Sequence, residues 1–278
     1  MLSTREVSAP NYQRFCQFLE RETGILLGDS KQYLVRSRLL GLLHDYADLS
    51  LDGLIDKAIQ GHDRKLQQRV LDSMTTNETL WFRDTYPFTL LTEQILPAMT
   101  PSNRKLRIWS AACSTGQEAY SIAMTILDFQ AKNPSALKSG FEVVGSDISE
   151  HVLQVANKGE YDKIAILRGL PASYQSKYFN KLGEDSLVVK PHLKQHVSFK
   201  KLNLLSPYTG MGTFDIVFCR NVLIYFSADN KKRILQQIAA CLSNDGSLLL
   251  GASESVTTVA DLFQMVKASK GLYYKKKI

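Results

Sequence analysis

Apolar side chains recur at helical spacing in the N-terminal part of the chain. Tyr12, Phe15 and Leu19 fall on one side of a helix, and this period predicts an amphipathic helix with a buried face. Three further amphipathic segments follow, each preceded by residues that favour a helix N-cap. These are Asp29 and Ser30 before a helix through His44, Ser50 before residues 51–60, and Asp63 before residues 64–73. Because the connections are short, we expect residues 1–75 to form a small helical domain.

From residue 100 onward, short apolar runs alternate with amphipathic segments. The runs that predict strands are residues 106–110, 141–146, 197–202, 214–219 and 247–251. The segments that predict helices are residues 117–132, 149–157 and 228–242. This alternation implies an α/β fold with a doubly wound, mostly parallel sheet. We place that domain in residues 100–278, and residues 76–99 link it to the helical domain.

Two stretches depart from the alternation. Residues 161–196 are rich in glycine and proline and are too long for a plain connection. They predict an inserted small β subdomain that begins with helices and ends in a hairpin around residues 182–185. At the end of the chain, two strand-like runs flank residues 269–271 and predict a closing hairpin.

Composition places the chain among ordinary globular proteins. It has 278 residues, of which 44% are hydrophobic and 22% are charged. No apolar run approaches the roughly 20 residues of a membrane span, and the N-terminus lacks the apolar part of a signal peptide. We therefore expect a cytoplasmic protein without direct membrane insertion.

Charge and cysteines add little. The net charge of +7 admits an anionic partner, but the excess is spread along the chain, and the terminal lysines are typical of a solvated face. The four cysteines lie far apart without a C-x-x-C pair. They are expected to be reduced, and a structural metal site is not expected.

Candidate ligand-binding residues follow the predicted strands. After the first strand, small side chains and Gly116 would let an adenosine or methionine backbone approach closely. The loop lacks the full G-x-G-x-x-G pattern, so a pyrophosphate site is not expected, and an ordinary tight turn remains an alternative. Asp147 ends the next strand, where a carboxylate can accept both ribose hydroxyls. Its alternative role is to cap the following helix.

Other polar residues at these ends also have two interpretations. Glu118 can favour the helix dipole or bind a cationic amino group. Asn203 suits an adenine edge or a turn. Asn221 follows the fourth strand, at the sheet edge where ligands bind, and Tyr225 comes shortly after it as a core or catalytic residue.

The segment 74–83 is unusual for a linker between domains. Polar residues alternate with Trp81 and Phe82, so the segment can fold over a ligand and supply hydroxyl, amide and guanidinium contacts. The alternative is the start of a helix capped by Thr76 or Asn77. Elsewhere the sequence has no G-x-S-x-G, P-loop lysine, H-E-x-x-H or paired Cys–His. The reaction must therefore need no strong base.

Together these segments resemble the chemotaxis receptor methyltransferases, the CheR family. The motifs that carry the resemblance are TTNETLWFRD, WSAACSTGQEAYSIA, SDIS, LNLL, FDIVFCRNVLIYF and GASES, in the family's order. The resemblance implies a Rossmann-like, class I S-adenosylmethionine-dependent methyltransferase with a helical N-terminal domain and an inserted β subdomain. It also implies transfer of a methyl group to glutamates on the cytoplasmic helical domain of chemoreceptors, forming methyl esters for sensory adaptation.

The resemblance also assigns roles to individual residues. Residues that it places at the cofactor are Asn77, Thr79, Arg83, Glu118, Asp147, Asn203, Leu204, Arg220 and Asn221. Arg83 and Tyr225 are implied to face the substrate carboxylate and to act in catalysis. Glu118 is implied to take the methionine amino group and Asp147 the ribose. The chain has Glu78 and Gln117 where other members differ, which removes none of these contacts.

Two other functions are compatible with parts of the sequence. The basic pI of about 9.1 admits an RNA methyltransferase, but aromatic residues among clustered Lys and Arg are not seen, so no nucleic acid is expected. A non-catalytic adaptor would be indicated by loss of Asp147, Asn221 or Arg83, and all three are present. Some CheR members bind a receptor C-terminal pentapeptide through the β subdomain. The short connection 180–186 with its single glycine predicts that this protein does not depend on it.

Overall fold

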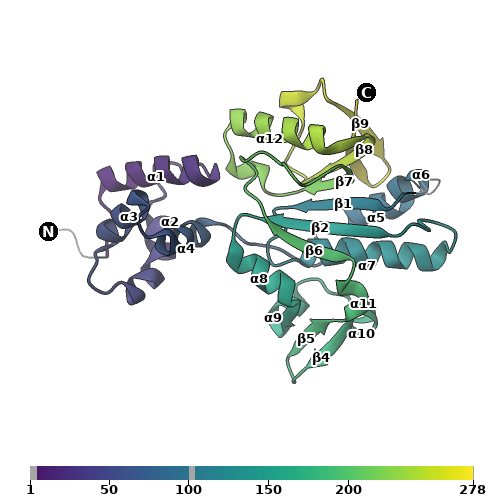
Figure 1. Ribbon diagram of the computed structural model, residues 1–278, viewed down its shortest axis with the longest axis horizontal. Coiled ribbons are helices and arrows are strands. Elements are labelled where there is room, and N and C mark those ends of the chain that lie inside the picture. Colours follow the sequence, from purple (N-terminus) through teal and green to yellow (C-terminus); the bar gives the residue numbers. More distant parts are fainter. Residues whose placement is uncertain (1–4, 100–103, 278) are drawn as a thin grey trace. The chain divides into compact units, whose positions relative to one another are not determined.

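The computed structural model describes residues 5–99 and 104–277. The chain divides into two compact units. One comprises Met1–Thr76 with Tyr225–Asn230, and the other comprises Asn77–Ile224 with Lys231–Ile278. The first unit is helical, and the second contains both β-sheets of the described chain (Figure 1).

The helical unit encloses its own apolar core. Its elements are α1 (Ala9–Thr23), α2 (Gln32–Leu39), the 3-10 helix η1 (Leu40–Asp45), α3 (Leu51–Gln60) and α4 (Arg64–Met74). Phe15, Leu19 and Val35 are completely buried in its core. This confirms the expected buried face of the first helix, since its apolar period puts Phe15 and Leu19 on the same side.

Two of the three expected helix caps are confirmed. The Ser50 hydroxyl accepts a hydrogen bond from the Gly53 amide at 3.1 Å, and Asp63 accepts one from the Leu66 amide at 2.9 Å. The expectation at Asp29 and Ser30 is wrong, because α2 begins at Gln32 with Lys31 at its N-cap and no side-chain cap bond.

The expected extension of α2 to His44 is also wrong. The α-helix ends at Leu39, and the chain continues as the 3-10 helix η1 through Asp45. Gly41 lies at the start of that stretch, and glycine weakens a helix interior by about 1 kcal/mol relative to alanine.

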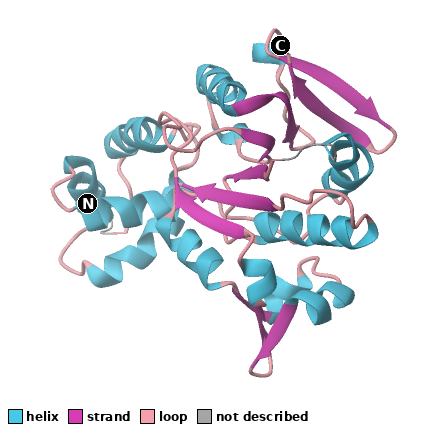
Figure 2. Ribbon diagram, turned by 45° about the vertical axis from the view of Figure 1, so that its right-hand side comes forward, coloured by secondary structure: helices cyan, strands magenta, loops and turns pink. Residues whose placement is uncertain are grey.

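A seven-stranded, mostly parallel sheet forms the centre of the second unit (Figure 2). Its strands are β1 (Leu106–Ala111), β2 (Phe141–Asp147), β6 (Val197–Lys201), β7 (Phe214–Cys219), β8 (Leu242–Leu250), β9 (Phe263–Ala268) and β10 (Gly271–Lys276). Their order is β6-β2-β1-β7-β8-β10-β9, and among these described strands only β10 runs opposite to the others, pairing antiparallel with both β8 and β9. The doubly wound, mostly parallel sheet expected from the sequence is confirmed, as is the closing hairpin.

The strand order reverses between β1 and β7, which creates a topological switch point. Ala111 pairs with both Ser146 of β2 and Cys219 of β7, so these strands end level with one another. In open α/β sheets, ligands bind beside the carboxyl ends of the strands at such a point.

Helices follow the strands as the sequence pattern predicts. The main ones are α7 (Gln117–Lys132), α8 (Glu150–Lys158) and α12 (Ala228–Cys241), and before β1 the chain forms α5 (Tyr86–Leu90), the π-helix η2 (Leu91–Ile95) and α6 (Leu96–Met99). All residues of β7 are buried, which is typical of a parallel strand covered on both faces. Among the residues described, no helix is both long enough and apolar enough to cross a membrane.

A second, three-stranded antiparallel sheet follows α8. Its elements are β3 (Glu160–Asp162), α9 (Lys163–Leu167), α10 (Ala172–Tyr178), β4 (Phe179–Leu182), β5 (Ser186–Val189) and α11 (Pro191–Lys194), with strand order β3-β5-β4. The hairpin expected around residues 182–185 is confirmed as β4 and β5. The pairing of β3 with β5 was missed, because a three-residue strand has too short a pattern to recognise.

This smaller sheet is joined to the main core through Trp81. The indole ring of Trp81 meets the rings of Tyr161 and Phe179 edge-on, with centroids 4.8 and 5.4 Å away. Its Nε1 donates to the Ala165 carbonyl oxygen at 3.0 Å, and its backbone amide donates to the Arg168 carbonyl oxygen at 3.1 Å. The segment 77–83 is therefore anchored on the subdomain.

Candidate functional site

The loop after β1 approaches the end of β2 closely. Ala112, Ser114 and Gly116 all have positive φ angles of 56°, 50° and 93°, and two of these are not glycine, which costs backbone strain. The Ser114 amide donates to Asp147 Oδ2 at 2.9 Å. The loop is therefore more specialised than an ordinary tight turn, since its strained residues are tied to the carboxylate at the neighbouring strand end.

Asp147 is held in place by two backbone amides. Its Oδ1 accepts from the Ser149 amide at 3.0 Å, besides the bond from Ser114 to Oδ2, and the residue is 7% exposed. The alternative in which Asp147 caps α8 is wrong, because the N-cap is Ser149, whose hydroxyl accepts from the Val152 amide. Asp147 thus lies at the sheet edge as a preorganised acceptor.

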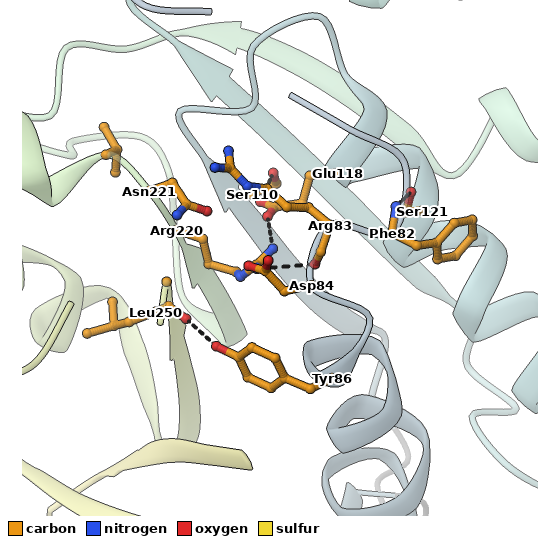
Figure 3. Close-up of polar contacts among 12 residues, drawn as sticks. Phe82, Arg83, Asp84, Tyr86, Ser110, Glu118, Ser121, Arg220, Asn221 and Leu250 are labelled. Atoms are coloured by element: carbon orange, nitrogen blue, oxygen red, sulfur yellow. Dashed lines mark hydrogen bonds and ion pairs between the residues drawn. The ribbon is translucent and has the colours of Figure 1, made fainter. Parts of the chain in front are cut away.

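A cluster of ion pairs around the buried Arg220 joins the end of β7, the first turn of α7 and the segment before α5 (Figure 3). The Arg220 side chain is 1% exposed and pairs with Glu118 Oε2 at 3.1 Å and Asp84 Oδ2 at 2.6 Å. It also donates to the Arg83 carbonyl oxygen at 3.2 Å. Glu118 accepts in addition from the Ser110 hydroxyl at 2.7 Å.

This cluster changes the interpretation of Glu118. Its carboxylate is engaged by Arg220 and Ser110, so it does more than favour the dipole of α7. Two carboxylates, those of Glu118 and Asp84, face the single guanidinium of Arg220. A carboxylate held in place at a site favours a cationic ligand group there.

Asn221 directly follows Arg220 and has a strained backbone. Its φ angle is 57°, in the left-handed region that a non-glycine residue rarely adopts. Its Oδ1 and the Nε of Arg220 are buried without a hydrogen-bond partner among the described residues. Buried polar atoms are normally satisfied, so these two point to a polar ligand.

The segment before α5 carries the remaining linker residues. Phe82, Asp84 and Thr85 have φ angles of 50°, 65° and 55°. The alternative of a helix capped by Thr76 or Asn77 is wrong, because α5 begins at Tyr86 after Thr85. The strained backbone of this segment therefore includes Asp84, the residue whose carboxylate pairs with Arg220.

The linker residues expected at the cofactor lie in this segment. The Asn77 carbonyl oxygen accepts from the Ser114 hydroxyl at 2.9 Å, which ties the linker to the β1 loop. Thr79 and Arg83 are both half-buried, and Arg83 Nη1 donates to the Glu78 carbonyl oxygen at 3.4 Å.

The residues after β6 form a turn. Asn203 Oδ1 accepts from the Leu205 amide at 2.9 Å, which is the local bond expected of a turn asparagine. Leu204 is buried. The turn interpretation of the Asn203 oxygen is therefore confirmed, and its role toward adenine stays a prediction.

Tyr225 belongs to the helical unit. It ends the 3-10 helix η3 (Leu223–Tyr225), and its backbone carbonyl oxygen accepts from the Leu26 amide at 2.9 Å. Its part in the reaction stays a prediction.

Sequence reasoning missed Asp84 and Glu254. Asp84 is the last residue of the TTNETLWFRD motif and Glu254 lies within GASES, so both motifs were recognised without a role for their acids. Glu254 accepts hydrogen bonds from the backbone amides after β7. The signal that could have found Glu254 is an acidic residue among the small turn residues of GASES, where a carboxylate can accept hydrogen bonds from backbone amides.

Comparison with known proteins identifies the family. Residues 77–272 match the family model described as "CheR methyltransferase, SAM binding domain", and residues 10–75 match "CheR methyltransferase, all-alpha domain". The chain belongs to the CheR methyltransferase family. It is a methyltransferase, and its cofactor is S-adenosylmethionine.

Curated relatives agree over nearly the whole length. Chemotaxis protein methyltransferase 1 of Vibrio cholerae is 48% identical over 98% of this chain and 98% of that protein. Chemotaxis protein methyltransferase 1 of Pseudomonas aeruginosa is 47% identical over 98% of this chain and 100% of that protein. The chemotaxis protein methyltransferase of Escherichia coli K12 is 32% identical, with 93% and 89% covered.

The strand-end residues fit S-adenosylmethionine. The Glu118 carboxylate, fixed by Ser110 and Arg220, suits the cationic amino group of its methionine part. Asp147 is a fixed carboxylate at the strand end where ribose is held in related folds. The partnerless Oδ1 of Asn221 and Nε of Arg220 offer further polar contacts.

Proposed function

We propose that this enzyme transfers the methyl group of S-adenosylmethionine to glutamate side chains on the cytoplasmic helical domain of chemoreceptors. The product is a glutamate methyl ester, which serves sensory adaptation. The family match across both units supports this substrate, as do relatives named chemotaxis protein methyltransferases. The observation that carries the proposal is the Glu118–Arg220–Asp84 cluster at the sheet edge, built around the buried Arg220. It suits the cofactor and offers no strong base.

The proposed cofactor contacts follow from these positions. Asp147 holds the ribose and Glu118 the amino group, while Arg220 and Asn221 close the site. The other contacts come from Asn77, Thr79 and Arg83 in the linker and from Asn203 and Leu204 beside the adenine. Since Asp147 and Glu118 are already fixed by hydrogen bonds to this chain, they lose little freedom when the cofactor binds.

The chemistry needs positioning more than proton transfer. When bound, the cofactor supplies an electrophilic methyl group on a positively charged sulfur. A glutamate side chain has a reference pKa near 4.3, so it is already an anionic nucleophile at neutral pH. We assign Arg83 to orient this carboxylate by charge-assisted hydrogen bonds, and Tyr225 to hold it through its hydroxyl. The step neutralises charge, so it would be favoured in a bound complex that excludes water.

The assay is methyl incorporation into receptor-containing membranes from labelled cofactor. We expect label that is released by mild alkali, because carboxyl methyl esters hydrolyse under these conditions. Membranes without receptors and total RNA serve as the control substrates. Alkali-stable label in RNA would support the other candidate class. A protein that binds the cofactor yet leaves receptors unlabelled would refute the proposed substrate.

We also propose that the enzyme works in the cytoplasm without depending on a receptor C-terminal pentapeptide. β4 is an edge strand of the small sheet, so its edge is open to an added strand, and it is the turn after β4 that disfavours the peptide. Only Gly183, Glu184 and Asp185 join β4 to β5, and their two acids would repel an acidic peptide terminus. We expect equal methylation of receptors with and without the pentapeptide. Saturable heat on titrating the free peptide, with a micromolar Kd, would contradict this.

A further inference from the structure

Glu254 links the turn after β7 to the end of β8. Its Oε1 accepts hydrogen bonds from the amides of Val222 and Leu223 at 2.9 and 2.8 Å. Its Oε2 accepts from the amides of Asn221 and Gly251 at 2.8 and 2.7 Å. One carboxylate therefore binds four backbone amides from two separate turns.

The first turn needs an anion to hold its shape. The amides of Asn221, Val222 and Leu223 are consecutive and converge on the same carboxylate. Such a series forms an anion-binding concavity, and bonds from backbone amides to a carboxylate are stronger than bonds between neutral groups. Glu254 thus compensates for the left-handed backbone of Asn221, whose φ is 57°.

Gly251 makes room for this contact. A Cβ at position 251 would lie 2.7 Å from Glu254 Oε2 and 3.0 Å from both the backbone amide nitrogen and the Nδ2 of Asn221. Any side chain there would separate the two turns. The absence of a side chain at 251 is a second, independent sign that the turn after β7 is built around Glu254.

We propose that Glu254 is a positioning residue for the cofactor site. It touches no reacting atom, and it acts by fixing the backbone of Asn221. That backbone in turn sets the direction of the partnerless Asn221 Oδ1 next to the buried Arg220. The inference rests on the proposed contact between Asn221 and the cofactor, and it explains how this contact is preorganised.

A double-mutant cycle tests the proposal without any methyl acceptor. The variants are Glu254→Gln, Asn221→Ala and the combination, and calorimetry measures the Kd for S-adenosylhomocysteine. The introduced glutamine would aim its amide NH₂ at two backbone N–H donors, so we expect Kd to rise about tenfold. If Glu254 acts through Asn221, the double variant should bind no more weakly than Asn221→Ala alone, because effects within one unit are not additive.

A general loss of structure predicts a different result. In that case the two effects on Kd would multiply, so the double variant would bind about ten times more weakly than Asn221→Ala alone, and the proposal would be overturned. It would also be overturned if Glu254→Gln bound the cofactor product like the wild type. Because no acceptor is present, failure of glutamate methylation leaves this test unaffected.

Two further variants keep the test decisive. Asp261→Asn changes an exposed carboxylate in the same connection between β8 and β9, and its Kd should equal that of the wild type. Gly251→Ala disturbs the same contact by placing a methyl group against Glu254 Oε2, and we expect it to raise Kd as Glu254→Gln does. If Glu254→Gln does not fold, Gly251→Ala takes its place in the double-mutant cycle. A folded Gly251→Ala enzyme with unchanged Kd would contradict the proposal.

Discussion

Replacing the buried Arg220 with methionine tests the ion-pair cluster directly. The substitution keeps much of the side-chain volume and removes the cation that pairs with Glu118 and Asp84. Glu118 is 14% exposed on its side chain, whereas Asp84 is 39% exposed and can recover water. Removing one partner of a buried pair costs about 3–5 kcal/mol. The exposure of Asp84 puts the expected loss of unfolding free energy at the lower end, about 3 kcal/mol.

Urea unfolding followed by tryptophan fluorescence measures this loss. The chain has two tryptophans, and both Trp81 and Trp109 are buried in the unit that holds the cluster, so the signal reports on that unit. Arg168→Met is the matched control, because Arg168 pairs with Glu78 at 2.7 Å but both side chains are exposed. Its expected cost is below about 1 kcal/mol. An Arg220→Met protein as stable as the control would refute the structural importance of the cluster.

Further expectations concern the cofactor, the substrate and pH. Asp147→Ala should weaken cofactor binding by about 2 kcal/mol, measured by calorimetry; unchanged affinity in a folded variant would exclude Asp147 from the site. Tyr225→Phe should lower kcat more than it weakens cofactor binding. A fully active variant would rule out a catalytic role for the Tyr225 hydroxyl. The hydrogen bond from Arg107, and to a smaller extent the one from Lys105, lowers the pKa of the Glu142 carboxyl group. The ionised carboxylate therefore stabilises the fold at pH values above its unfolded pKa. The wild-type advantage over Glu142→Gln, about 1 kcal/mol or less, should therefore shrink as pH falls below about 4.3 in acid unfolding; a gap independent of pH would contradict this.

Regular elements with a strong local pattern were predictable from the sequence. The helix expected over residues 117–132 is found as α7 with those bounds, because Gly116 and a long apolar period define it locally. β8 was expected to begin at Ser247 but begins at Leu242. The polar residues 243–245 and Gly246 look like a turn, and only the pairing with β7, which includes a register shift, extends the strand.

The site was predictable as a set of strand ends but not as a network. The strand pattern places Asp147, Glu118 and Asn221 at one sheet edge, since parallel strands end on the same side. The pairing of Arg220 with Glu118 and Asp84 joins residues 102 and 136 positions apart. No local pattern encodes such a pairing, because it depends on how the strained linker folds back on the sheet.

The anchoring of Trp81 bears on how this enzyme can be shortened or recombined. An inserted subdomain is usually treated as a module that a short loop can replace. Here, deleting it would expose an indole that now packs on Tyr161 and Phe179, and would remove the carbonyl groups that hold residue 81. The segment leading to Arg83 would lose its support. A minimal catalytic domain must therefore keep the insertion or rebuild the apolar surface beneath Trp81.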